Sequence, residues 1–123
     1  MIITPEIVVL AKKVTTKYGL NQCRQCATEL RKIFAANGLH GHVLQLTTSG
    51  GRGFIVMRDS DFRLPFPMPL GKDAITETGQ HFGVQVGQYI FDNIFKEGIL
   101  KMRWESQFDC DVHSFKINII EPF

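Results

Sequence analysis

The segment Gly79–Asn93, GQHFGVQVGQYIFDN, constrains the fold of this chain more than any other part of it. It predicts a β-hairpin with Gly87 and Gln88 as a two-residue turn, because glycine at the first central position suits the turn types that join antiparallel strands. In this register Val84 lies opposite Phe91, and directly opposed residues share a face of the hairpin. A slip of one residue would turn that face to solvent, so the register is well specified. The face is entirely apolar and consists of Phe82, Val84, Val86, Tyr89 and Phe91.

The opposite face of the predicted hairpin brings a histidine and a carboxylate together. His81 and Asp92 are diagonal neighbours there, with Cβ atoms within roughly 7–8 Å, which the two side chains can bridge. Gly83 lies directly opposite Asp92 and is expected to leave open space beside the pair. We expect Asp92 to hold the His81 ring and to favour one tautomer, which leaves the other ring nitrogen for a nucleophile. Turn chemistry that ends the strand is the alternative role for Asp92 and Asn93. This second face carries His81, Gly83, Gln85, Ile90 and Asp92.

Two helices are expected before the hairpin. The first starts with a capping hydroxyl at Thr4 and with Pro5 at the first helical position, and Gly19 is expected to end it. The second runs from about Gln22 to Asn37, with apolar residues at three- and four-residue steps. Asn21 is the candidate N-cap of this second helix.

The remaining segments predict strands, one short helix and a loop. The runs His42–Thr47 and Phe54–Arg58 flank a Ser-Gly-Gly turn and are expected to pair with each other. Asp59–Gly71 contains three alternating prolines and is expected to be an extended loop. Leu100–Phe108 predicts a short helix, and the alternating residues from Phe115 onward predict a final strand. Because helices precede strands, the expected fold class is α+β, with N-terminal helices packed on a small antiparallel sheet.

Length and composition limit the classes of protein to consider. The 123 residues are expected to form a single domain, 1–123. The net charge is +2 and the basic residues are scattered, which argues against nucleic-acid binding. No apolar run approaches the roughly 20 residues that span a bilayer, and no signal peptide is visible. Three cysteines, an odd number, indicate reduced thiols that work in a cytosolic compartment.

Cys23 is the best candidate for a nucleophile in this chain. It falls in the first turn of the second predicted helix, and a helix N-terminus or a nearby imidazolium lowers a thiol's pKa from its ordinary value of roughly 8.5. Cys26 lies one turn further on, on the apolar face, and is expected to be structural. The spacing of Cys23 and Cys26 also fits a redox motif, and with Cys110 and His113 they would make a Cys₃His zinc set. Both alternatives are disfavoured, because a helix precedes the motif and the second pair lies far downstream, so we expect neither a metal nor a cofactor.

These motifs, in this order, resemble the papain-fold toxin domains of bacterial polymorphic toxin systems. The resemblance covers about residues 17–108 and rests on C-x-x-C-A, G-x-H-x-G-V and the F-D-N after the hairpin, followed by the lone Trp104. It implies a papain-like fold with a triad of Cys23 as nucleophile, His81 as base and Asp92 as the orienting residue. It also implies peptidase, deamidase or related thiol acyl-transfer chemistry.

The same resemblance implies a biological setting. Such domains usually form the C-terminal tip of a larger secreted or contact-delivered protein, act on a protein or peptide in the target-cell cytoplasm, and are neutralised by a cognate immunity protein. Papain-like enzymes place a glutamine upstream of the nucleophile to help the oxyanion hole, and here Gln22 is directly adjacent to Cys23. The segment LPFPMPL, residues 64–70, is not part of the family pattern, and either a lip of the cleft or an immunity-protein contact would explain it.

Two other classes of function stay open at this point. A non-catalytic binding domain that docks through the fold and its proline-rich loop would keep its biological effect without Cys23 or His81. A nuclease toxin that uses His81 and basic residues would destroy RNA or DNA, and the weak clustering of Lys and Arg argues against it.

Overall fold

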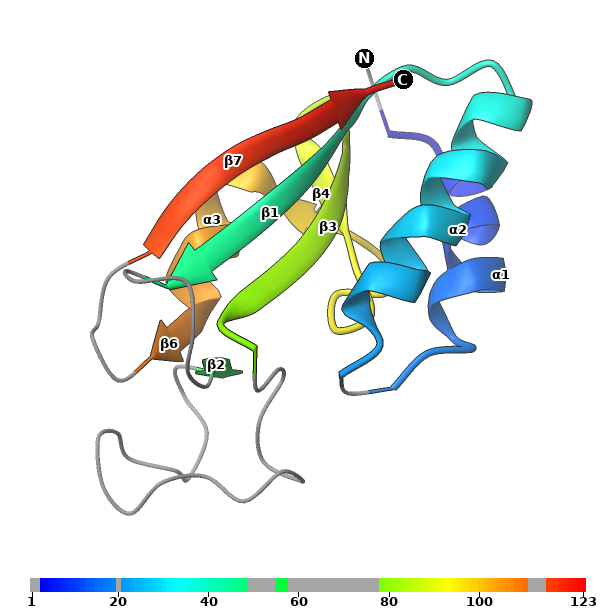
Figure 1. Ribbon diagram of the computed structural model, residues 1–123. Coiled ribbons are helices and arrows are strands. Elements are labelled where there is room, and N and C mark those ends of the chain that lie inside the picture. The colour runs from blue at the N-terminus through cyan, green and yellow to red at the C-terminus, as the bar shows by residue number, and fades with distance from the viewer. Residues whose placement is uncertain (1–2, 20, 49–54, 58–77, 111–114) are drawn as a thin grey trace.

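The computed structural model of the protein describes residues 3–19, 21–48, 55–57, 78–110 and 115–123 (Figure 1). Two helices come first and short strands follow, with one further helix and a 3₁₀ turn between them. The elements in chain order are α1 (Pro5–Thr15), α2 (Cys23–Ala36), β1 (His42–Thr48), β2 (Ile55–Met57), β3 (Gln80–Val86), β4 (Tyr89–Phe91), β5 (Ile99–Leu100), α3 (Lys101–Trp104), η2 (Glu105–Gln107), β6 (Phe108–Cys110) and β7 (Phe115–Pro122).

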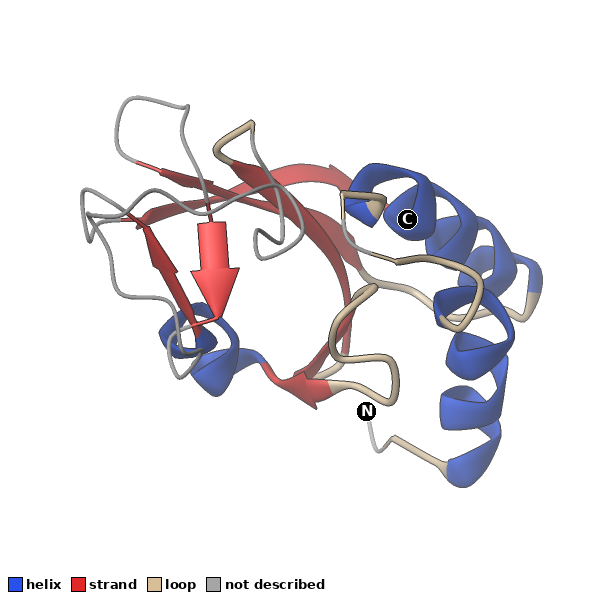
Figure 2. Cartoon of the chain, turned by 90° about the horizontal axis from the view of Figure 1, so that it is seen from below, coloured by secondary structure: helices blue, strands red, loops and turns tan. Residues whose placement is uncertain are grey.

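The strands form a five-stranded antiparallel sheet in the order β5-β4-β3-β1-β7 and a separate pair of β2 and β6. Helices α1 and α2 cover one face of the large sheet, while α3 lies on the other side (Figures 1 and 2). Each side has its own cluster of buried apolar residues. The α+β class expected from the sequence is therefore confirmed. The cluster under the helices includes Val14, Leu30, Phe34, Val84 and Phe91, and the cluster on the far side includes Leu44, Leu46, Ile90, Trp104 and Phe108.

Helix α1 begins as the sequence predicts but ends earlier. The Thr4 hydroxyl accepts a hydrogen bond from the Ile7 amide at 3.4 Å, which satisfies one of the unpaired amides of the first turn. The helix ends at Thr15 and not at Gly19. The Lys96 ammonium donates to the Thr15 carbonyl at 3.1 Å, so a distant side chain takes over the role that was expected of the glycine.

Helix α2 begins at Cys23, within one residue of the predicted start. Its N-cap is Gln22 and not Asn21, and the Gln22 side chain makes no capping hydrogen bond to the helix. Asn21 has a φ of 64°, a left-handed conformation that non-glycine residues seldom adopt. The buried face of α2 packs against β3, and its buried residues are Cys23, Cys26, Ala27, Leu30 and Phe34.

The predicted hairpin is present as β3 and β4 in the expected register. Val84 pairs with Phe91 and Val86 pairs with Tyr89, and Gly87 in the turn has a φ of 60°. Its apolar face belongs to the cluster under α1 and α2. Because β4 ends at Phe91, the chain leaves the ladder one residue before Asp92.

The predicted pairing of the two strands that precede the hairpin is wrong. Strand β1 lies between β3 and β7 and pairs with both, whereas β2 pairs with β6. Side chains of β1 enter both apolar clusters of the protein, one on each face of the sheet. Burial on both faces therefore determines the partners of β1, and the turn that follows it in the sequence does not. Residues Phe54 and Arg58 of the second predicted strand, and the expected loop 59–71, lie outside the described residues.

The C-terminal elements follow the prediction in part. The helix expected over residues 100–108 is shorter, because Leu100 belongs to β5, α3 covers Lys101–Trp104 and continues as a 3₁₀ turn, and Phe108 begins β6. The final strand β7 starts at Phe115 as expected and pairs with β1 along its length, with a bulge near its end.

Candidate active site

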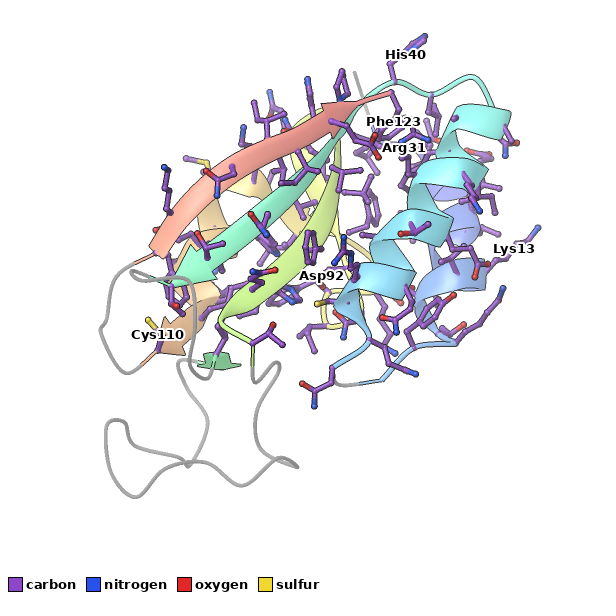
Figure 3. All side chains as sticks on the ribbon, viewed as in Figure 1. Lys13, Arg31, His40, Asp92, Cys110 and Phe123 are labelled. Atoms are coloured by element: carbon purple, nitrogen blue, oxygen red, sulfur yellow. The ribbon has the colours of Figure 1, made fainter. Side chains whose placement is uncertain are left out.

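The fold brings the start of α2 to the start of β3. Cys23 is the first residue of α2, and its thiol lies 3.9 Å from the Gln80 carbonyl, toward which it donates. His81 follows Gln80 in β3, and Asp92 follows the last residue of β4. Figure 3 shows Asp92 beside β3 and the lower half of α2. The three residues expected to act together are thus brought to one place from three elements.

His81 and Asp92 form a buried pair. The His81 Nε2 atom lies 2.8 Å from Asp92 Oδ2, and both side chains are fully buried. The same Oδ2 accepts a hydrogen bond from Trp104 Nε1 at 2.8 Å. The other oxygen, Oδ1, accepts from the amides of Ile94, at 2.9 Å, and Phe95. Asp92 therefore orients the ring with one oxygen and shapes the turn with the other, which unites the two roles that the sequence left open.

The ring nitrogen that remains for Cys23 is Nδ1. Asp92 occupies Nε2, which fixes the orientation of the imidazole. Nδ1 is buried and makes no hydrogen bond to the described residues, so it is the free face of the ring. The Cys23 thiol interacts with this ring, and His81 and Cys23 each shift the other's pKa. The arrangement is a thiol, an imidazole and a carboxylate in series.

The electrostatics of the three groups favour a thiolate and an imidazolium. Burial alone would raise the pKa of Cys23, but its interaction with His81, the charge of the imidazolium and the Phe82 amide together lower the pKa below its ordinary value. Burial would lower the pKa of His81, yet Asp92 and Cys23 raise it to about 9. Burial would also raise the pKa of Asp92, and His81, Trp104 and the Phe95 amide outweigh it and hold that pKa low. At neutral pH the ring is therefore protonated, and the imidazolium favours the thiolate form of Cys23.

Comparison with known proteins identifies the family. The family model described as papain fold toxin 2 matches residues 6–109, which include α1, α2, the hairpin and the three residues of the series. The chain belongs to the papain fold toxin 2 family. Searches of the curated proteins and of the solved structures found no significant match. The helices and the five-stranded antiparallel sheet of this papain fold toxin domain are consistent with a papain-like fold. None of the helices in its described parts is both long and apolar enough to cross a membrane.

The second cysteine of the toxin domain has the properties of a structural residue. Cys26 has no exposed surface, and burial raises the pKa of its thiol to about 12. It therefore carries almost no thiolate at neutral pH and is a poor nucleophile. Cys110 is buried in β6, and His113 lies outside the described residues. Within the described ranges no group of three His, Cys, Asp or Glu side chains is placed to hold a metal ion.

Gln22 of the toxin domain is anchored to the loop that precedes the nucleophile. Its Oε1 atom accepts a hydrogen bond from the Gly19 amide at 2.8 Å, and the residue is exposed. Only the amide end, Nε2, is thus left to donate to an oxyanion. The Cys23 amide, in the first turn of α2, is one of the amides that have no acceptor within a helix. These two N–H groups are candidate donors to an oxyanion formed beside the thiol.

An aromatic wall supports the His81 ring, and the sequence reasoning missed it. The ring centroid of His81 lies 5.8 Å from that of Trp104 and 4.9 Å from that of Phe108. The open space expected beside Gly83 is absent, because a Cβ atom there would lie 2.7 Å from Ile90 Cγ2 and 3.0 Å from Trp104 Cζ2. The glycine makes room for the indole and not for a substrate. The only signal for this contact in the sequence is the lone tryptophan downstream of the hairpin.

Replacing Gly83 by alanine is expected to destabilise the domain by about 1–3 kcal/mol, since the added methyl group must displace Ile90 or the Trp104 indole. Urea unfolding followed by the fluorescence of the single tryptophan measures the loss of stability. The fluorescence of the folded variant shows whether the indole has moved. Gly19→Ala is the control, because its Cβ would meet only Gln22 Oε1, at 3.9 Å. A Gly83→Ala protein as stable as the wild type would contradict this packing.

Proposed function

We propose that this papain fold toxin domain is a cysteine-nucleophile acyl-transfer enzyme, a peptidase, deamidase or related activity. Its catalytic residues are Cys23, His81 and Asp92. The observation that carries the proposal is the series of contacts from the thiol through the imidazole to the buried carboxylate. Membership of the toxin family supports it, and so do the pKa shifts that favour a thiolate beside an imidazolium.

In the first half of the reaction the Cys23 thiolate attacks the carbonyl carbon of a protein or peptide amide. A carbon–sulfur bond forms and the carbonyl π electrons move to oxygen, which gives a tetrahedral oxyanion. The Cys23 amide and, by its Nε2 group, Gln22 are the proposed donors to that oxyanion. As the carbon–nitrogen bond breaks, the His81 imidazolium gives its Nδ1 proton to the leaving amine. The product is a thioester on Cys23.

In the second half the neutral His81 ring takes a proton from the incoming nucleophile. That nucleophile attacks the thioester, and the carbon–sulfur bond breaks to restore the thiolate and the imidazolium. Water gives hydrolysis of a peptide bond or deamidation of a side-chain amide, and an amine gives transfer. Asp92 stays ionised throughout and stabilises the protonated ring.

We place this chemistry in the cytoplasm of a target cell. The proposed setting is a domain that a larger secreted or contact-delivered bacterial toxin carries, with a cognate immunity protein in the producing cell. Family membership supports this setting. The thiol chemistry fits it too, because a reducing cytosol keeps Cys23 in its reactive form.

Alkylation by iodoacetamide tests the assignment of the nucleophile. At pH 7 we expect mass spectrometry to find Cys23 labelled and Cys26 unlabelled, because the pKa of Cys23 is lowered and that of Cys26 is raised to about 12. The rate of Cys23 labelling should reach half its maximum at a pH below the ordinary thiol value of roughly 8.5. Turnover, unlike labelling, should fall again above pH about 9, where His81 loses the proton that the leaving group needs.

The matched control is His81→Gln, a neutral replacement that keeps polar groups in the site. In this variant the midpoint of Cys23 labelling should move up toward the ordinary thiol value, because the imidazolium no longer stabilises the thiolate. The proposal fails if native Cys23 is no more reactive than Cys26, or if the variant leaves the midpoint unchanged.

A further inference from the structure

Asn93 is the polar residue of the F-D-N motif that the proposed triad does not use. Its side chain is almost fully buried, with 2% of its surface exposed. The Nδ2 group donates a hydrogen bond of 2.8 Å to the carbonyl of Gly19, which lies 74 residues away in the sequence. Gly19 is four residues before Cys23. The bond therefore joins the turn that carries Asp92 to the loop that leads into the nucleophile.

A second set of contacts joins the same two segments. The Lys96 ammonium donates to the carbonyl of Thr15 at 3.1 Å and to that of Tyr18 at 2.9 Å. In the opposite direction, the Thr15 hydroxyl donates to the Lys96 carbonyl at 3.1 Å. We call the turn 92–97 together with these bonds to residues 15–19 the clamp. The clamp holds the end of α1 and the residues after it by hydrogen bonds between side chains and main-chain carbonyls.

The clamp is built on the carboxylate that orients His81. Asp92 Oδ1 holds the amides of Ile94 and Phe95, so the shape of the turn depends on the residue that also binds the ring. On the other side, Gly19 is held at both of its main-chain groups, the carbonyl by Asn93 and the amide by Gln22. The loop before Cys23 is thus hydrogen-bonded to the same turn that Asp92 stabilises.

The loop also contains a residue in an uncommon backbone conformation. Asn21, two residues before Cys23, has a φ of 64°. Asparagine adopts this conformation more readily than other non-glycine residues, and here it forms part of the turn that leads into α2. The bonds at Gly19 are the contacts that fix the entry to this segment.

We propose that Asn93 is a positioning residue that sets the distance between Cys23 and His81 by tying the Gly19 carbonyl to the Asp92 turn. The inference rests on the proposed function, since it concerns the geometry of the same thiol and imidazole. Displacements of about 1 Å in a catalytic constellation cost about a hundredfold in rate, so a single buried bond at this place is significant.

The test uses the neutral replacements Asn93→Leu and Asn93→Ala, which remove the donor and add no charge beside Asp92. The measured quantity is the pH midpoint of Cys23 alkylation by iodoacetamide, with the ultraviolet absorbance of the thiolate as a second readout. Loss of the bond should move the midpoint upward, toward the ordinary thiol value. A rise of one pH unit corresponds to about a tenfold lower labelling rate below the midpoint.

Val14→Ala is the matched control, because it weakens the packing of α1 and removes none of the hydrogen bonds of the clamp. A purely structural role of Asn93 predicts that its variants and Val14→Ala lower the melting temperature alike and leave the midpoint where it is. Should both Asn93 variants fail to fold, Thr15→Val removes another bond of the clamp, also without a change of charge. This variant is then expected to raise the midpoint.

The outcomes separate the two proposals. A native protein with a lowered midpoint and folded Asn93 variants with the same midpoint would overturn the positioning role alone. The same applies to an unchanged midpoint in Thr15→Val if that variant has to be used. A native midpoint in the ordinary thiol range would instead overturn the proposed function, and the positioning role with it. A raised midpoint in the variants, with Val14→Ala unchanged, supports the positioning role.

Discussion

Replacing Cys23 by alanine should abolish the toxicity of the domain in the cytosol of a sensitive cell and leave the fold intact. In the proposed mechanism the sulfur forms the bond to substrate, and removal of a nucleophile from a catalytic triad lowers the rate by at least about a thousandfold. The measurement is the growth of cells that express the domain from a repressible promoter. The melting temperature of the purified variant shows whether the fold survives.

Cys26→Ala is the matched control for this experiment. Both cysteines lie in the first two turns of α2 and both are buried, so both replacements remove the same atom from similar surroundings. We expect Cys26→Ala to cost about 1–2 kcal/mol of stability and to remain toxic. If the Cys23 variant kept full toxicity, the enzyme proposal would be wrong and a non-catalytic binding domain would be the better reading. Equal loss of toxicity in both variants would show that the loss comes from a less stable fold and not from removal of the nucleophile.

The parts of the site that were predictable from the sequence are those that local patterns determine. The turn at Gly87 and the alternation around it fix the register of the hairpin, and the register places His81 and Asp92 on one face. The start of α2 was predictable within one residue from its apolar periodicity. These local signals are sufficient to bring a histidine and a carboxylate together, and to put Cys23 at a helix start.

The parts that were not predictable depend on contacts between distant segments. Trp104 fills the space beside Gly83, and a pattern within the hairpin cannot show which downstream ring will pack there. Asn21 was expected to cap α2, but it lies in a left-handed turn, in a loop that is hydrogen-bonded at Gly19 to Asn93, 74 residues away. The predicted pairing of β1 with the next strand in the sequence was wrong for the same reason. Burial on both faces of this central strand determines its partners, β3 and β7, more strongly than closeness in sequence.

Asp92 is the residue whose replacement should have the largest combined effect on stability and activity. It accepts hydrogen bonds from Trp104 and from the amides of Ile94 and Phe95, and it is paired with His81. Asp92→Ala would leave these buried donors without their acceptor, and we expect a loss of about 3–5 kcal/mol in the free energy of unfolding. Urea unfolding followed by Trp104 fluorescence measures it.

Asp92→Asn separates the charge of this residue from its shape. The amide retains an acceptor oxygen, so it should be more stable than the alanine variant, but it no longer stabilises an imidazolium. The pKa of His81 should fall from about 9 toward its ordinary value or below, because only Cys23 then opposes the effect of burial. At neutral pH the ring is then neutral and the Cys23 thiolate loses its partner. We expect activity to fall by about 10²–10⁴-fold, as for the loss of an orienting carboxylate in general.

The pH dependence of stability gives an independent check on the same variant. Because the pKa of His81 is higher in the folded protein than the ordinary 6.5, its protonation stabilises the native state fully below pH 6.5 and progressively less as the pH rises through about 9. Native protein should therefore lose stability between these two values, and Asp92→Asn should lose much less over the same range. NMR titration of the His81 ring protons reads the pKa directly in both proteins. Equal stability profiles and an unchanged His81 pKa would show that Asp92 does not hold the imidazolium, and the orienting role assigned to its carboxylate would be wrong even if Cys23 proved to be the nucleophile.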